Sequence, residues 1–196
     1  MRGNRKALFK DQQVQGLLGL LVATWLVLGT WYWATTNLHW LDALRHVALN
    51  VTSVVTTTGF ALGDYSLWGN FSLMLFFYLG FVGGCSGSTA GGIKIGTLVV
   101  LLFIIFTEIR GETAVNIGNR RLPRSMQRQA LTIVSLTTFV IIGSVMLLRL
   151  TTNFDLDQIL FEVVSATGTV GLSTGITASL PDHAKFLLSL LMLFGR

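Results

Sequence analysis

A glycine-rich interruption inside a long apolar segment constrains the fold of this chain most strongly. Residues 81–96 read FVGGCSGSTAGGIKIG and join apolar stretches at 71–82 and 93–107. As helices at 1.5 Å per residue, these stretches would be about 18 and 22 Å long, so neither crosses ~30 Å of hydrocarbon alone. Glycine is a poor helix former, and hydrocarbon penalises backbone that is not hydrogen-bonded to itself. The sequence therefore predicts one interrupted crossing whose break, at 83–92, is covered by protein or by water.

The composition indicates an integral membrane protein. Hydrophobic residues make up 52% of the chain and charged residues 12%, against about 25% charged in ordinary soluble domains. Of the 14 Lys and Arg, four lie in the first ten residues and five lie between Arg110 and Arg128. Basic flanks of this kind mark cytoplasmic loops, whereas a nucleic-acid surface would interleave the charges with stacking aromatic residues. The charge therefore indicates membrane orientation, and no nucleic-acid partner is expected.

Two further segments, 17–36 and 130–150, are each long and apolar enough to cross a membrane as a helix. Each is followed by a shorter, Thr-rich segment that is typical of re-entrant structure, with short helices predicted at about 42–55 and 157–167. The fold class expected is all-α integral membrane, and the chain, which stops within the apolar run LLMLFGR, is expected to be a fragment. The expected organisation is a cytoplasmic linker end at 1–16, a first repeat at 17–108 with spans 17–36 and 70–108, a basic cytoplasmic loop at 109–129, and a truncated second repeat at 130–196 with spans at 130–150 and from 184.

The two repeats match each other at a constant offset of 112 residues. Both begin from a basic flank and so have the same membrane orientation, and parallel repeats around an axis along the membrane normal form a pore or channel-like pathway. Chance similarity between apolar helices explains matches of Leu and Val, but not an ordered set of glycines and a threonine. The matching pairs include Leu44 and Leu156, Val51 and Val163, Ser53 and Ser165, Thr57 and Thr169, Gly59 and Gly171, and Gly63 and Gly175.

Equivalent glycine-containing loops, VTTTGF at 55–60 and TGTVGL at 167–172, follow the two short helices. An ion crossing a membrane exchanges its hydration shell for other oxygens, which backbone carbonyls supply where the chain adopts conformations that favour glycine. We expect Thr and Val to keep these loops extended, Gly59 and Gly171 to supply the unusual torsions, and the C-terminal dipoles of the short helices to attract a cation. Asp64 would concentrate cations at an outer mouth. The predicted filter segments are 56–60 and 168–172.

Motifs for enzyme chemistry fail on spacing in the glycine run. A phosphate-binding P-loop needs Lys directly after Gly and a hydroxyl after the Lys, but Ile93 separates Gly92 from Lys94 and no hydroxyl follows. Neither Ser of the run is framed as a nucleophile elbow. The single cysteine, Cys85, excludes an internal disulfide and has no His partner on its predicted side of the membrane. We therefore expect neither enzyme activity nor a cofactor bound by this chain.

The same motifs carry a resemblance to a known family. NVTSVVTTTGFALGDYSLW followed by FVGGCSGSTAGGIK resembles the third unit of the Trk/Ktr/HKT superfamily of potassium transporters, most closely the bacterial TrkH-type potassium uptake subunit. SATGTVGLSTG resembles the loop of the fourth unit. The resemblance covers essentially the whole chain and implies potassium-channel-like units of span, pore helix, filter loop and span, four of them around one pore. The chain then holds two of an expected four units.

The resemblance also implies roles for particular residues. The break in the third unit is an intramembrane loop below the filter that acts as a gate, and one glycine of each filter loop maps onto the signature glycine of potassium channels. The implied filter residues, which would hold K⁺, are Thr56, Thr57, Thr58, Gly59, Gly168, Thr169, Val170 and Gly171. The implied gate residues are Gly83, Gly84, Gly87, Ser88, Gly91, Gly92, Lys94 and Arg196.

Three charged residues leave alternatives open. Lys94 is expected either to face an aqueous cavity or a partner oxygen, because a cation at membrane depth is costly, or to lie near the cytoplasmic interface and snorkel. Arg196 aligns with Gly84 and is expected beside the gating loop, the alternative being a fraying chain end. Glu162 aligns with Asn50 and is expected to pack or hydrogen-bond behind the filter, with a direct role at the ion as the alternative.

The leading hypothesis is the ion-translocating subunit of a Trk-type potassium uptake system. The alternatives are a Na⁺-permeable or cation-coupled secondary transporter of the same superfamily, and an inactive fragment or scaffold. The resemblance implies a bacterial inner-membrane protein whose N-terminal end in this chain is cytoplasmic. It also implies a peripheral nucleotide-binding regulatory subunit in the cytoplasm, and a homodimer of the full-length protein.

Overall fold

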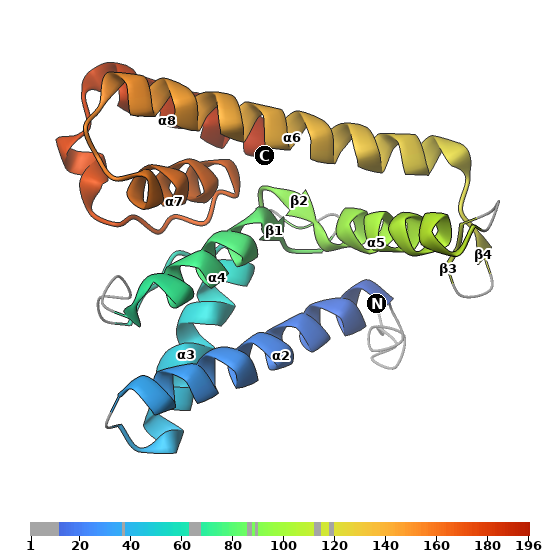
Figure 1. Ribbon diagram of the computed structural model, residues 1–196, viewed down its shortest axis with the longest axis horizontal. Coiled ribbons are helices and arrows are strands. Elements are labelled where there is room, and N and C mark those ends of the chain that lie inside the picture. The colour runs from blue at the N-terminus through green and yellow to red at the C-terminus, as the bar shows by residue number, and fades with distance from the viewer. Residues whose placement is uncertain are drawn as a thin grey trace, which may run out of the picture.

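The computed structural model describes residues 12–36, 38–62, 68–85, 88, 90–111, 115–117 and 120–196. The described chain is mostly helical and falls into two similar halves (Figure 1). The elements of the first half are α2 (Gln12–Thr35), α3 (Trp40–Val55), α4 (Asn70–Phe81), β1 (Val82–Gly83), β2 (Ile93–Lys94) and α5 (Ile95–Arg110). Those that follow are β3 (Asn116–Ile117), β4 (Arg120–Arg121), α6 (Arg124–Thr151), α7 (Leu156–Thr167), the 3-10 helix η2 (Ile176–Ser179) and α8 (Asp182–Gly195).

Two helices, α2 and α6, are long and apolar enough to cross a membrane by length and composition. Many of their apolar side chains point outward, among them Phe139 and Leu150 on α6, which are 77% and 84% exposed. Exposed apolar surface of this extent along a whole helix is matched by an apolar surrounding such as lipid. The lengths of α2 and α6 follow from the uninterrupted apolar runs predicted at 17–36 and 130–150.

The interrupted segment forms α4 and α5, which Figure 1 shows one after the other with β1 and β2 between them. The interruption extends from Val82 to Lys94, slightly beyond the predicted break at 83–92. After α4 ends, the chain satisfies part of its backbone by parallel pairing of Val82 with Ile93 and of Gly83 with Lys94. Gly84, on the same loop, accepts a hydrogen bond from the amide of Ile95 at 3.2 Å. The break is thus stabilised by backbone pairing, as hydrocarbon requires.

Two details of the structure differ from the predicted fold. The all-α expectation misses the parallel strand pair in the break and an antiparallel pair, β3 and β4, in the basic segment. The predicted loop at 109–129 is shorter than expected, because α5 continues to Arg110 and α6 already begins at Arg124. Arg is a good helix former, and Pro123 at the N-cap of α6 directs the chain into the helix without needing a backbone donor.

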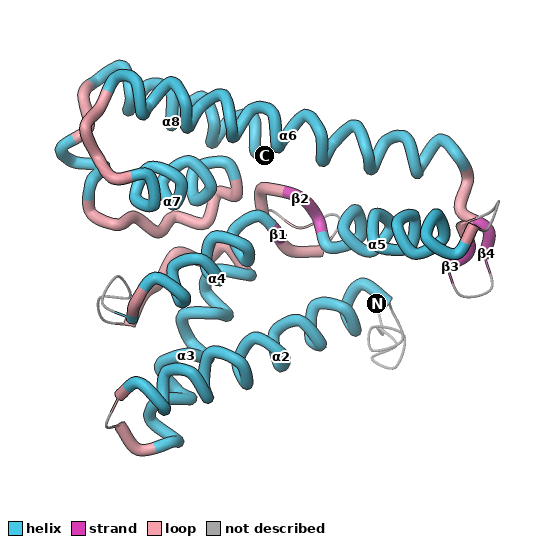
Figure 2. The backbone as a smooth tube through the Cα atoms, in the orientation of Figure 1, coloured by secondary structure: helices cyan, strands magenta, loops and turns pink. Residues whose placement is uncertain are grey.

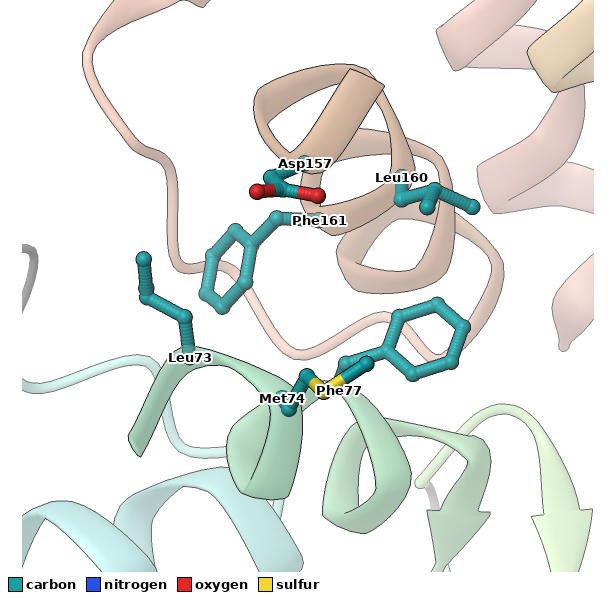
Figure 3. Close-up of a pocket in the computed structure, with 6 residues that line it drawn as sticks. All are labelled: Leu73, Met74, Phe77, Asp157, Leu160 and Phe161. Atoms are coloured by element: carbon teal, nitrogen blue, oxygen red, sulfur yellow. The ribbon is translucent and has the colours of Figure 1, made fainter. Parts of the chain in front are cut away.

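The two halves share a hydrophobic core. A cluster of buried side chains from α2, α3 and α4, including Leu28, Val51 and Phe76, also contains Phe161 and Val170 of the second half. Figure 3 shows side chains of α4 and α7 facing each other across a cavity of about 220 Å³. Contacts between α4 and α7 therefore fix the second short helix and its loop against the first half.

Replacing Phe76 by Ala should destabilise the protein far more than replacing its near neighbour on α4, Met74. Phe76 is 2% exposed and lies with its ring centroid 5.9 Å from that of Trp68, whereas Met74 is 67% exposed. Emptying the Phe76 site removes packing on all sides, for an expected loss of roughly 3 kcal/mol. Thermal unfolding of the protein purified in detergent checks this, with Met74→Ala as the control. Equal shifts of Tm for the two variants would contradict the observed packing.

Candidate functional site

The short helix α3 ends in a turn that α7 reproduces. At the end of α3 the amide of Thr57 donates to the carbonyl of Val54 at 3.1 Å, and the amide of Thr58 donates to Ser53 at 2.9 Å. This pair of bonds is a Schellman motif, which satisfies the last carbonyls of a helix by placing one residue in the left-handed region. At the end of α7 the bonds recur 112 residues later, from Thr169 to Ala166 at 3.1 Å and from Val170 to Ser165 at 2.9 Å.

The backbone torsions of the two loops also agree. Thr57 and Thr169 have φ of 52° and 51°, and Gly59 and Gly171 have φ of 80° and 83°. The unusual torsions expected at the two glycines are present, but the expectation that the threonines stay extended is wrong at Thr57 and Thr169. The Schellman turn requires the left-handed conformation there, and a β-branched residue adopts it only at a cost of about 1–3 kcal/mol. Both loops are therefore held in an unusual conformation by the helix ends before them.

The two loops lie against each other. A Cβ built on Gly59 would lie 3.0 Å from the carbonyl oxygen of Val170, and one built on Gly171 would lie 3.6 Å from the Cα of Gly59. The structure thus brings together loops that are 112 residues apart in the sequence. Thr56 and Thr58 are exposed, and their hydroxyls pair with each other at 2.7 Å. At Gly168, a Cβ would overlap the carbonyl oxygen of Gly80, so this position packs tightly on the end of α4.

On each short helix, a buried polar side chain hydrogen-bonds to the segment that follows the loop. Asn50, 1% exposed, accepts a hydrogen bond from the amide of Leu62 at 2.9 Å and donates to its carbonyl at 3.4 Å. Glu162, 5% exposed, occupies the equivalent position on α7. Its Oε1 accepts hydrogen bonds from the Ser173 hydroxyl at 2.5 Å and the Thr174 amide at 3.0 Å. Of the two alternatives for Glu162, the structure shows hydrogen bonding to the segment after the loop.

The glycine-rich break lies under the second loop and beside the end of α8. The amide of Gly91 donates to the hydroxyl of Thr169 at 2.9 Å, and the amide of Gly92 donates to the carbonyl of Gly195 at 3.0 Å. A Cβ at Gly91 would lie 2.7 Å from Thr169 Oγ1 and 2.9 Å from the carbonyl carbon of Gly168. Figure 2 shows the connection between α4 and α5 that carries these glycines. Close approach to Thr169 and Gly168 explains the glycine at position 91.

The two cations named from the sequence lie at this break. Lys94 donates from Nζ to the carbonyl of Ala90 and, at 3.4 Å, to that of Ser88. Arg196 is exposed and lines a cavity of about 170 Å³ together with Gly92. The structure therefore places the arginine beside the break. Gly83 and Gly84 are buried in it. Asp64 and Gly87 lie outside the described residues.

Sequence reasoning missed two features of the site. The first is the left-handed conformation of Thr57 and Thr169, for which residue type gives no signal because Thr rarely adopts it. The second is the hydrogen bond from Gly91 to the Thr169 hydroxyl, which joins segments 78 residues apart. The polar side chains behind the loops, by contrast, had a sequence signal, because Asn50 aligns with Glu162 in the two predicted short helices.

Two helices long and apolar enough to span a membrane, and two loops of matching left-handed torsions in contact beside a broken helix, define the class: a helical membrane protein with an internal repeat. The TrkH family, described as cation transport protein, matches residues 14–196. The chain therefore belongs to the TrkH family of cation transport proteins.

The chain is similar to several named relatives. It is 38% identical to the Trk system potassium uptake protein TrkI of Halomonas elongata, over all of this chain and 42% of that protein. It is 35% identical to the potassium/sodium uptake protein NtpJ of Enterococcus hirae, over 71% of this chain and 32% of that protein. Its fold matches the crystal structure of the potassium transporter TrkH from Vibrio parahaemolyticus with a TM-score of 0.85 and 23% identity, over 97% of this chain and 43% of that one. The chain thus spans less than half the length of these relatives.

Replacing Glu162 by Gln should loosen the segment that follows the second loop. An amide has one acceptor oxygen, so either the Thr174 amide or the Thr177 hydroxyl, now 3.0 and 2.8 Å from the carboxylate, loses its acceptor. We expect faster hydrogen exchange at Thr174 and a loss of about 1–3 kcal/mol in stability. Hydrogen-exchange mass spectrometry measures the first and thermal unfolding the second. Glu108→Gln, on the exposed surface of α5, is the control. Unchanged exchange at Thr174 in Glu162→Gln would contradict this role.

Proposed function

We propose that this chain is part of the ion-translocating subunit of a Trk-type potassium uptake system, and that K⁺ passes along the loops at Gly59 and Gly171. One observation carries the proposal: two loops of matching backbone conformation lie in direct contact, each at the end of a short helix. The names of the relatives, several of them potassium uptake proteins, agree with it.

In this proposal, backbone carbonyl oxygens coordinate the ion. A partly dehydrated K⁺ needs several oxygens at nearly the free energy of its hydration shell, and carbonyls in fixed unusual torsions supply them without charge. The ends of α3 and α7 point roughly half a negative charge each towards the loops that follow, which favours a cation there. The proposed ligands are the carbonyls of Thr56, Thr57, Thr58, Gly59, Gly168, Thr169, Val170 and Gly171. Asp64 would attract cations at the outer mouth.

Two loops cannot surround an ion, so the rest of the filter must come from outside this chain. The chain covers 42% of its relative TrkI, which leaves length for two further units of the same kind. We propose four units around one pore in the full-length protein, which would be a homodimer in a bacterial inner membrane. The basic segment near 110–128 would be cytoplasmic, and a peripheral nucleotide-binding regulatory subunit would dock on that side. The exposure of Gly171 fits an ion path open to missing neighbours.

The break between α4 and α5 is proposed as the gate of this path. It lies against Gly168 and Thr169, at the base of the second loop. The backbone of the break packs closely at several of its described glycines, which are Gly83, Gly84, Gly91 and Gly92. A small displacement of this backbone would therefore change the width of the proposed path. Arg196 borders the same cavity as Gly92, and Lys94 binds the loop carbonyls.

A Na⁺-permeable transporter is the second candidate. The observation that favours it is the name of the Enterococcus relative, a potassium/sodium uptake protein that is 35% identical to this chain. Selectivity depends on all the loops that surround the ion, and this chain holds only two of them. Flux measured for both ions in one preparation distinguishes the two candidates and also a non-transporting scaffold.

Replacing Gly59 by Ala in the full-length protein should impair transport. The φ of 80° disfavours Ala, and its Cβ would lie 3.0 Å from the carbonyl oxygen of Val170. Because this strain costs about 1–3 kcal/mol, we expect either a loss of about tenfold or more in Rb⁺ flux or a loss of selectivity. Uptake of ⁸⁶Rb⁺ and ²²Na⁺ into liposomes measures both.

The matched control is Gly143→Ala on α6, where a Cβ meets open space. Its uptake should equal that of the unmodified protein. If Gly59→Ala also leaves Rb⁺ uptake and the Rb⁺/Na⁺ ratio unchanged, Gly59 does not line the ion path. If the unmodified protein passes Na⁺ as fast as Rb⁺, the Na⁺-permeable candidate is correct. If it passes neither, the transport proposal fails.

A further inference from the structure

We propose that the side chain of Thr169 latches the glycine-rich break against the second filter loop, so that the gate opens only when this hydrogen bond is lost. The inference gives a single side chain a positioning role between the two parts of the site. Its consequence for transport rests on the proposed function, but the contact itself does not.

The contact is direct and closely packed. Thr169 Oγ1 accepts a hydrogen bond from the amide of Gly91 at 2.9 Å. A Cβ at Gly91 would lie 2.7 Å from Oγ1 and 2.8 Å from Cγ2 of the same threonine, so the loop backbone rests on this side chain. Ala90 and Gly91 are buried, and a backbone amide there needs an acceptor within the protein. Thr169 supplies that acceptor to Gly91.

The backbone torsion of Thr169 disfavours threonine, so the presence of threonine there needs a reason. Its φ of 51° is the left-handed conformation that Gly adopts freely and that a β-branched residue disfavours. Gly at this position would relieve the strain, but it would leave the Gly91 amide without the hydroxyl. Thr57 has nearly the same torsion, but among the described residues the hydroxyl bonds of its loop are made by Thr56 and Thr58, and none by Thr57. Thr57 and Thr169 therefore occupy equivalent positions of the two loops, but of the two only Thr169 bonds to the break. Comparing variants of both separates the effect of the loop position from the effect of the latch.

The latch is one of two hydrogen bonds that join Gly91 and Gly92 of the break to the second half of the chain. The other is the main-chain bond from the Gly92 amide to the carbonyl of Gly195, at 3.0 Å, which no side-chain substitution at Thr169 removes. Losing the hydroxyl should therefore loosen the loop without releasing it. The expected change is about fivefold in the population of the displaced loop, the factor that corresponds to one ordinary hydrogen bond.

Cys85 provides a direct readout of loop position. It lies on the break, is partly buried, and carries a free thiol. In the full-length protein, with any cysteines outside this chain replaced, the rate of maleimide labelling at Cys85 reports how often the loop opens. Thr169→Val keeps the shape and β-branching of threonine and removes the hydroxyl. Thr169→Ala removes the hydroxyl without the branch, in case the valine variant does not fold, and Thr169→Ser keeps the hydroxyl. Thr57→Val measures the effect of removing a filter hydroxyl that makes no bond to the break.

We expect labelling of Cys85 to be about fivefold faster in Thr169→Val and Thr169→Ala than in the unmodified protein, and close to unmodified in Thr169→Ser and Thr57→Val. Uptake of ⁸⁶Rb⁺ by the same samples separates the two proposals. Faster labelling in a protein that carries no Rb⁺ supports the latch and contradicts the proposed transport. Rb⁺ uptake together with equal labelling in Thr169→Val and Thr57→Val overturns the latch, and so does labelling in Thr169→Ser as fast as in Thr169→Ala.

Discussion

Hydrocarbon offers no hydrogen bonds to a protein backbone, and the rest of this structure depends on how the break between α4 and α5 meets that constraint. Part of the break pairs with itself, through the short parallel strands β1 and β2. The amides of Gly91 and Gly92 instead find acceptors in the second half of the chain, on Thr169 and Gly195. The need to satisfy these amides therefore draws the second loop and the end of α8 onto the broken helix.

The two halves of the chain are alike in their loops but differ in the segments around them. Their short helices end in the same turn, and their loops have nearly the same torsions, so the two loops are related by a near symmetry. Below the loops, the first half is broken at Val82–Lys94, whereas α8 of the second half is continuous from Asp182 to Gly195. Behind the loops, a neutral amide at Asn50 corresponds to a carboxylate at Glu162. The two loops are therefore alike in backbone conformation, whereas the segments that pack around them differ between the halves.

Much of this arrangement follows from the sequence for identifiable reasons. Apolar length predicts α2 and α6, the glycine run predicts the break, and an offset of 112 residues predicts two matching loops. Each of these is a local pattern or a comparison between local patterns. The left-handed threonines are set by the hydrogen bonds at the helix ends, and the start of α6 at Arg124 depends on the N-cap at Pro123. The threonine torsions depend on backbone hydrogen bonds that residue type does not indicate, whereas the start of α6 has a local signal in Pro123 that the apolar pattern alone does not use.

The contact between the break and Thr169 is of a different kind. It joins residues 78 apart in the chain, so no local pattern indicates it. The glycines at 83 and 91 could be taken from the sequence as hinges, but in the structure they are sites of close approach to Gly91 and Thr169. Close packing explains why side chains are absent there: within the break itself at Gly83, and against the second loop at Gly91.

The proposed ion path requires a monovalent cation to bind between the loops at Gly59 and Gly171. The most direct test is the anomalous difference density of Rb⁺ in crystals of the full-length protein grown in RbCl. We expect a peak within coordination distance of carbonyl oxygens from both loops, because backbone carbonyls in these fixed torsions can replace the hydration shell of the ion. Rb⁺ bound elsewhere in the protein, with no density between the two loops, would contradict the account.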